Sequence, residues 1–103
     1  MEKKNKITIL PLFEQDMQGA IHYISKVLDN PSAAERLLDK TYSEIKKRLK
    51  NPLAFALYDD GKKRKDKYYR ILVNNFSVFY VVLDDVMEVR RFIYNRRDLK
   101  KII

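Results

Sequence analysis

Residues 68–98 constrain the fold more than any other stretch of the chain. Three runs rich in β-branched and aromatic side chains are separated there by two polar pairs, Asn74-Asn75 and Asp84-Asp85. Such side chains favour strands, and Asn and Asp tolerate the positive φ angles that two-residue hairpin turns require. The stretch therefore predicts a three-stranded antiparallel meander.

Two helices are predicted before the meander. Apolar side chains recur at three- and four-residue steps over residues 13–28 and again over residues 34–49, which is typical of helices with one buried face. Asn30 followed by Pro31 predicts the start of the second helix, because Asn caps free backbone N–H groups and proline has none to leave unpaired. The short connection between the two helices predicts an antiparallel hairpin.

The order of these elements defines a fold class. Residues 6–10 predict a short strand, whereas the apolar residues 53–58 fit neither a helix nor a strand by their periodicity. We expect one α+β domain over residues 1–103, in the order β-α-α-β-β-β. In it an antiparallel sheet, made of the C-terminal meander plus the N-terminal strand, packs on one antiparallel helix hairpin.

Two-residue turns would divide the meander into two faces. The face toward the helices would carry Tyr69, Ile71, Val73, Phe76, Val78, Tyr80, Val82, Met87, Val89 and Ile93, with Arg91 as its only charge. The other face, which we call the open face, would carry Tyr68, Arg70, Leu72, Ser77, Phe79, Val81, Val86, Glu88, Arg90 and Phe92. A register slip of one residue would exchange the two faces.

The predicted open face combines arginines with apolar side chains. Arg70, Phe79 and Arg90 would form one row across three strands, either as simple surface packing or as a platform for a base and its phosphates. An apolar centre with a basic rim also suits an acidic, amphipathic peptide. The candidate partner-binding residues are Arg70, Leu72, Phe79, Val81, Arg90, Phe92, Arg96 and Arg97.

Composition narrows the classes of function. The net charge of +8 predicts attraction to a nucleic acid, a ribosome, an acidic protein or, less well, a lipid surface. The sequence has no cysteine and one histidine, so we expect neither a disulfide nor a metal site. We also expect no cofactor. No apolar run reaches the length of a membrane span and no signal peptide is visible, so we expect a cytoplasmic protein with no membrane contact.

Catalysis, if present, would depend on cations. No Ser/His/Asp set, Cys/His set or phosphate-binding glycine loop is present, but cations can stabilise the extra charge of an RNA-cleavage transition state. A solvated loop, or a phosphate-contacting patch without chemistry, is the favoured explanation of the run at residues 62–65. The nuclease candidates are Lys62, Lys63, Arg64, Lys65, Arg70, Arg90 and Arg96.

Several motifs resemble the RelE/ParE superfamily of bacterial type II toxin–antitoxin toxins. They are Asn30-Pro31 with residues 33–37, the hairpin at residues 69–80, and the end of the chain from Val89 to Arg91 and from Asn95 to Asp98. The resemblance implies a small toxin neutralised by an antitoxin that wraps it. RelE-like members cut mRNA on the ribosome, whereas ParE-like members poison DNA gyrase.

The motifs are more similar to the ParE branch. Arg96 matches an arginine that the RelE branch keeps, but Ser77 stands where that branch has a strand arginine, and Ile102 lies near the place of its terminal tyrosine or histidine. The resemblance therefore implies a non-enzymatic gyrase inhibitor, held by a cognate acidic antitoxin in a hetero-oligomer. A RelE-like mRNA interferase that acts on the ribosome is the alternative, and a family member without toxicity is a third.

Overall fold

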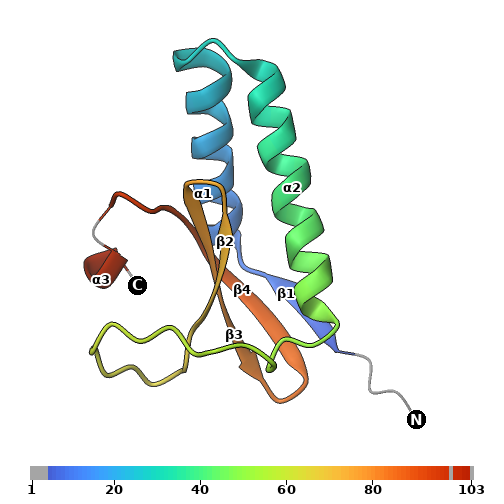
Figure 1. Ribbon diagram of the computed structural model, residues 1–103, viewed down its shortest axis with the longest axis vertical. Helices are drawn as coiled ribbons and strands as arrows, with labels where there is room; N and C mark the ends of the chain where they lie inside the picture. Colours follow the sequence, from blue (N-terminus) through green and yellow to red (C-terminus); the bar gives the residue numbers. More distant parts are fainter. Residues whose placement is uncertain (1–4, 98, 103) are drawn as a thin grey trace.

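The computed structural model describes residues 5–97 and 99–102, which form a helix hairpin packed on a four-stranded sheet (Figure 1). The predicted α+β fold and its element order are confirmed, with a short C-terminal helix added. No helix in the described part of the chain is long and apolar enough to cross a membrane. The elements are β1 (Lys6–Ile9), α1 (Pro11–His22), the π-helical turn η1 (Tyr23–Val27), α2 (Pro31–Leu49), β2 (Tyr69–Val73), β3 (Phe76–Leu83), β4 (Val86–Tyr94) and α3 (Leu99–Ile102).

The C-terminal meander is confirmed with both of its predicted turns. Val73 pairs with Phe76 and Leu83 with Val86, so two residues form each turn. Asn74 and Asp84 adopt positive φ angles of 54° and 57°, which their short polar side chains tolerate. The sheet order is β1-β4-β3-β2, and β1 runs parallel to β4, so the N-terminal strand makes the sheet mixed.

A bulge in β4 changes which of its side chains face the helices. Phe79 of β3 lies opposite Arg91 and Tyr80 lies opposite Val89, which leaves Arg90 as an extra residue. The extra residue reverses the alternation of side chains beyond it. The predicted row of Arg70, Phe79 and Arg90 is therefore wrong in its third member.

The same bulge exchanges the faces of two buried side chains. Phe92 lies opposite Val78 and belongs to the core, whereas Ile93 lies opposite Ser77. The predicted faces of Phe92 and Ile93 are therefore wrong. Sequence alternation assumes an unbroken period of two, and nothing in the residues around Arg90 marks the inserted position.

The helix hairpin has the predicted boundary between its two helices. The Asn30 side chain accepts a hydrogen bond from the Ala33 N–H at 3.2 Å, and Pro31 is the first residue of α2. The first helix starts at Pro11 and continues beyond His22 as η1, before Asp29 turns the chain with a φ of 52°. Figure 1 shows that the hairpin projects well beyond the end of the sheet.

Phe13 lies at the centre of the core, between the hairpin and the sheet. Its ring meets the edges of Tyr42 and Phe92 at centroid distances of 6.3 and 5.8 Å, a favoured geometry for aromatic pairs. The core around it joins one face of α1, one face of α2 and one face of the sheet. Its buried members are Phe13, Met17, Leu37, Ile45, Tyr69, Ile71, Val73, Val78, Tyr80, Met87, Val89 and Phe92.

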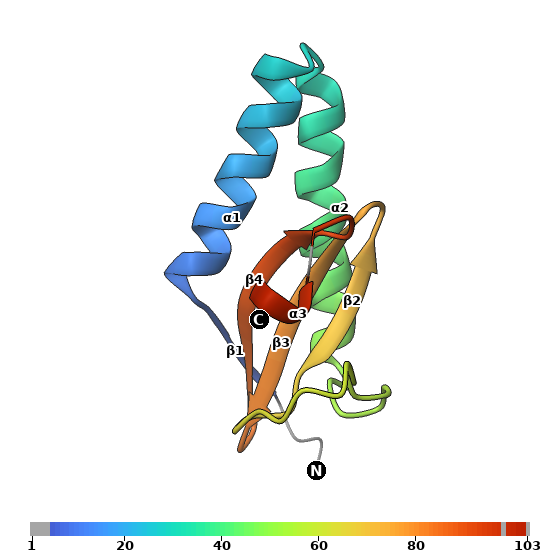
Figure 2. The same ribbon diagram turned by 90° about the vertical axis from the view of Figure 1, so that its left-hand side faces the viewer.

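Asp16 of α1 binds the edge of β4 just beyond the point where β1 ends. The Leu10 N–H bonds the Val89 carbonyl at 2.9 Å, and the chain then turns into α1, which lies beside β4 (Figure 2). One Asp16 oxygen accepts the Phe92 N–H at 3.0 Å, and the carboxylate also takes two Arg91 donors at 2.8 and 3.1 Å. A helix side chain thus satisfies a strand N–H that would otherwise be unpaired.

We predict that Asp16→Ala lowers the free energy of unfolding by about 2 kcal/mol, because it leaves Arg91 and the Phe92 N–H without their acceptor. Urea unfolding followed by circular dichroism measures the change. Gln15→Ala, at the exposed neighbouring position on α1, is the control and is expected to stay within about 0.5 kcal/mol of wild type. Equal effects of the two substitutions would show that Asp16 does not hold this edge.

Candidate functional site

Residues 58–68, which we call the covering segment, lie over the open face of the sheet. The Tyr58 and Tyr68 rings meet Phe79 at centroid distances of 5.1 and 6.4 Å, and the Tyr58 N–H bonds the Tyr68 carbonyl at 2.8 Å. Phe79 and Val81 are completely buried. We expected a partner to cover these two side chains, whereas the chain itself covers them.

One ion pair lies within the covering segment, and another joins the segment to β4. Arg64 donates to both oxygens of Asp60, at 3.0 and 2.7 Å, and these hydrogen bonds hold the pKa of Asp60 at about 2, well below its usual 3.8. Arg90, the bulge residue, bonds Asp66 at 2.9 Å and Glu88 at 2.8 Å. Both arginines thus already have carboxylate partners.

The surroundings of Arg90 favour its charged form. Burial by itself would lower the pKa of its guanidinium, but hydrogen bonds to Tyr68, Glu88 and Asp66 outweigh that effect and raise the pKa above its ordinary value. The bulge places this arginine against the covering segment, where it bonds Asp66 and Tyr68. Its role in the structure is therefore to hold the covering segment on the sheet.

Arg70 differs from these two arginines because its partners are neutral. Its Nε donates to Ser77 Oγ at 2.7 Å and its Nη2 to Asn95 Oδ1 at 3.2 Å, while its guanidinium lies 5.6 Å from the Tyr58 ring centroid. Ser77, fully buried, also donates to Asn95. Within residues 5–97 and 99–102, Arg70 makes no ion pair, so its charge remains available to an anion.

The structure does not gather the nuclease candidates into one site. Lys62, Lys63 and Lys65 are exposed on the covering segment, before β2 begins. Arg96 and Arg97 are also exposed, but they follow Asn95, whose N–H bonds the Asn75 carbonyl at 2.8 Å beyond the other end of β2. The Asp98 of the predicted C-terminal motif lies outside the described residues.

A groove of about 720 Å³ lies between α1, the start of α2 and the β2–β3 turn. The hairpin projects beyond the sheet at this end (Figure 1). Most of the residues that line the groove are apolar or aromatic. The polar residues along the groove include Asp16 and Arg97. Its apolar and aromatic side chains include Tyr23, Ile24, Leu28, Leu37, Phe76, Phe92 and Tyr94.

Of the predicted partner-binding residues, only Phe92 and Arg97 line this groove. Leu72 is 63 % exposed on the sheet, and Arg70 and Arg90 lie under the covering segment. No local sequence signal predicts the groove, because it depends on where the helix hairpin lies along the sheet.

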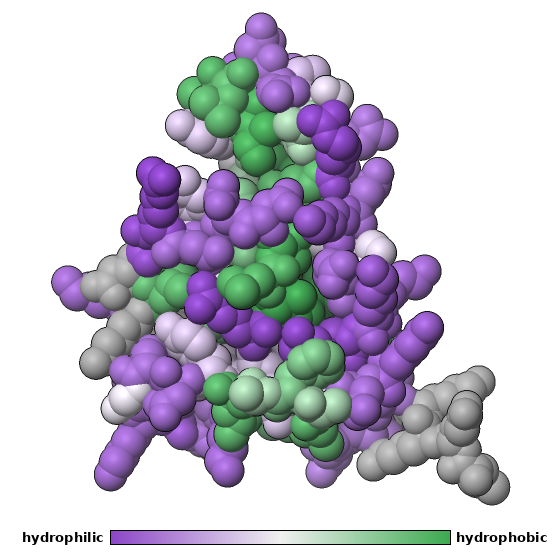
Figure 3. Space-filling model, viewed as in Figure 1, coloured by the Kyte–Doolittle hydropathy of each residue, from purple (hydrophilic) through white to green (hydrophobic). Residues whose placement is uncertain are grey.

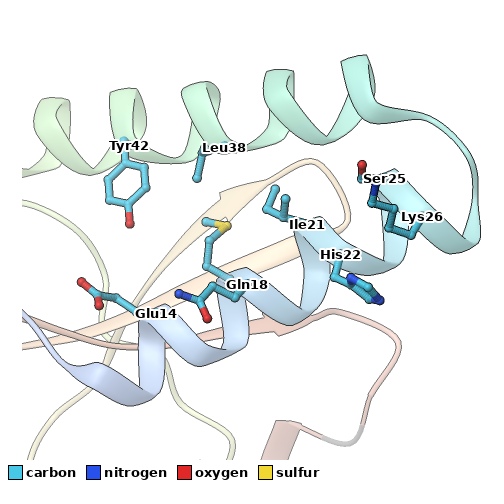
Figure 4. A pocket seen from close by; sticks show the side chains of 9 residues that line it. Glu14, Gln18, Ile21, His22, Ser25, Lys26, Leu38 and Tyr42 are labelled. Carbon is cyan, nitrogen blue, oxygen red and sulfur yellow. The ribbon is translucent and has the colours of Figure 1, made fainter.

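A second hollow, of about 500 Å³, lies between α1 and α2 on the outer side of the hairpin (Figure 4). Met17, Ile21 and Leu38 contribute its apolar part, and the Tyr42 hydroxyl points across it toward α1. Burial, and then the Glu14 carboxylate, raise the pKa of Tyr42. No cluster of three His, Cys, Asp or Glu side chains suited to a metal occurs in the described part of the chain.

Comparison with known proteins identifies the family. A family model described as the ParE toxin of the type II toxin–antitoxin system parDE matches residues 7–99. The chain belongs to the ParE toxin family. A ParE toxin is one component of a toxin–antitoxin system, so an antitoxin partner is implied.

A solved structure similar to this ParE-family chain is described as a chromosomal ParDE toxin–antitoxin system from P. aeruginosa. The two share 14 % sequence identity with a TM-score of 0.70, over 88 % of this chain and 96 % of the other. That similarity shows a shared fold. No curated protein sequence matches the chain.

The Asp60–Arg64 pair predicts a dependence of stability on pH. Because folding lowers the pKa of Asp60 from 3.8 to about 2, the pair stabilises the fold fully above the unfolded value and loses this effect as the pH falls toward 2. We expect Asp60→Asn to be less stable than wild type near neutral pH, with the difference disappearing over this range.

Urea unfolding at a series of pH values measures this difference. Arg64→Gln should remove the same step, since it removes the donor that lowers the pKa. A difference between wild type and Asp60→Asn that stays constant through the acid range would contradict the assignment.

Proposed function

We propose that this protein is a ParE-type toxin that binds and inhibits DNA gyrase, and that a cognate acidic antitoxin neutralises it. The match to the ParE toxin family over residues 7–99 carries the proposal. The arrangement of the cations supports protein binding rather than RNA cleavage. Arg64 and Arg90 are engaged by carboxylates, and the remaining candidates are divided between the two ends of β2.

The groove beneath the hairpin is the proposed seat of the antitoxin. Its aromatic and aliphatic walls suit the apolar side of an amphipathic helix, which binds through side chains spaced three and four residues apart. The net charge of +8 attracts an acidic chain to this basic protein, and Arg97 at the groove offers a cation to it.

An assay with purified gyrase and plasmid tests the target. We predict that the protein blocks supercoiling and accumulates cleaved DNA complexes when gyrase, plasmid and ATP are present, because a gyrase poison traps the enzyme on cut DNA. Unchanged supercoiling without trapped complexes would contradict the gyrase target. Codon-specific cuts in a translation reaction, mapped by primer extension, would favour the mRNA interferase instead, and normal growth after induction would indicate a member without toxicity.

Substitution at Leu28 tests the groove. Leu28 lines it and is 55 % exposed, so Leu28→Asp would place a carboxylate against the apolar side of the antitoxin. We predict about a tenfold or greater loss of affinity for the acidic protein encoded beside the gene, measured by calorimetry. Val27→Asp is the matched control, because Val27 is 62 % exposed and is absent from the groove lining. Equal losses would place the antitoxin elsewhere.

A further inference from the structure

Residues 53–57, which we call the apolar segment, display three large side chains that the core does not use. Leu53, Phe55 and Leu57 are 61 %, 49 % and 43 % exposed, and the segment forms neither helix nor strand. Figure 3 shows apolar side chains gathered at the base of the molecule, over the stretch that follows α2, with hydrophilic side chains around them. Grouped exposed apolar side chains mark surfaces that meet a partner.

The fold holds the apolar segment in place at both ends. On one side Pro52 is buried, and its carbonyl accepts the Tyr80 hydroxyl at 2.7 Å. On the other side Tyr58 bonds Tyr68 and packs on Phe79. Five residues between two such anchors have a restricted path, so less conformational entropy is lost when a partner binds them.

Arg48 fixes the centre of the apolar segment. Its guanidinium carbon lies 3.5 Å from the centroid of the Phe55 ring, while its Nη1 bonds the Tyr80 hydroxyl at 3.0 Å and the Arg70 carbonyl at 3.4 Å. One face of the Phe55 ring therefore rests on a cation that α2 and the sheet position together. The apolar segment is thus held at three points, by Pro52, Phe55 and Tyr58.

Most of the net charge of the protein surrounds this segment. Between residues 46 and 67 the sequence has nine basic and three acidic side chains, which accounts for six of its eight net positive charges. Two of the three acids, Asp60 and Asp66, are already paired with Arg64 and Arg90. The exposed cations include Lys46, Lys47, Lys50, Lys63 and Lys65.

The apolar segment is separate from the groove beneath the hairpin. The two surfaces share no residue, since the groove is lined by α1, the start of α2 and the far end of the meander. In Figure 1 the segment after α2 runs along the base of the molecule, whereas the hairpin projects at the opposite end. The two surfaces can therefore be tested by separate substitutions.

We propose that the apolar segment with its cationic surroundings is the surface by which this toxin engages its target protein. The complementary chemistry is an apolar pocket bordered by carboxylates on that target. This inference rests on the proposed function only in the identity of the target. The position of the surface follows from exposure, anchoring and charge.

The test compares wild type with the variant that carries Leu53→Ser, Phe55→Ser and Leu57→Ser, after circular dichroism has confirmed that it folds. We expect growth arrest on induction to be lost, the concentration for half inhibition of gyrase to rise by about tenfold or more, and affinity for the antitoxin to stay unchanged. Leu12→Ser is the control, because Leu12 is 45 % exposed on α1 and lies outside both the groove and the apolar segment. It should act as wild type does.

A charge-reversed pair gives a second readout. Lys50→Glu with Lys63→Glu should weaken target binding and reduce its salt dependence. Lys26→Glu with Arg36→Glu makes the same change in net charge on exposed helix positions away from the apolar segment, and should have little effect. Equal loss from both pairs would overturn the inference in favour of general charge attraction.

The outcomes separate this inference from the gyrase proposal. If wild type neither binds nor inhibits gyrase but the triple variant still loses growth arrest, the gyrase target falls and the apolar segment stands. Growth arrest by the triple variant as strong as wild type overturns the inference, and so does a wild type that neither arrests growth nor binds gyrase. Binding of wild type, but not of the triple variant, to phosphatidylglycerol vesicles would replace the protein target with a membrane surface.

Discussion

The bulge at Arg90 determines the layout of the whole molecule. One inserted residue turns Phe92 toward Phe13 and the helices, and it places Arg91 beside Asp16 on α1. It also directs Arg90 to the other side, where its guanidinium fastens residues 58–68. Packing of the helix hairpin and coverage of the sheet therefore both involve this bulge, which reverses the alternation of side chains along β4.

The covering segment partly buries the arginines of the open face, so this face of the sheet does not present an exposed basic surface. Arginines pack against the tyrosines of the covering segment, with Arg64 and Arg90 over Tyr68 and with Arg70 over Tyr58. Carboxylates neutralise Arg64 and Arg90 at short range, whereas the lysines around them extend into solvent. Arginine suits the first role because its planar fork stacks and pairs at once, and lysine suits the second as a hydrated point charge.

Local signals in the sequence were sufficient to predict the helices, strands and turns. They were not sufficient to predict the contacts between residues far apart in the sequence. Asn30-Pro31 and the two polar pairs of the meander act through neighbouring backbone, so the cap and both turns are where they were predicted. The bulge leaves no mark in composition. Coverage of Phe79 by Tyr58 joins residues that sequence periodicity cannot relate, and the parallel direction of β1 depends on its path beside β4.

The predicted partner-binding residues show the same division between local and distant effects. Phe92 and Arg97 line the groove, but Phe92 reaches it through the bulge, from the face opposite to the expected one. Tyr23 and Leu28 were not candidates, because they lie where the helix passes the end of the sheet. That overhang depends on where the helix hairpin lies along the sheet, which no local motif specifies.

The pairing of β1 with β4 also determines the order in which the protein can fold during its synthesis. Among the described strands β1 pairs with β4 alone. Lys6 pairs with Val86, so the first strand must wait for about eighty further residues before this neighbour is synthesised. The helix hairpin, by contrast, closes between near neighbours along the chain and can form much earlier. A growing chain on the ribosome therefore cannot complete its sheet, or the support that Arg91 and Phe92 receive from Asp16, until synthesis is nearly finished.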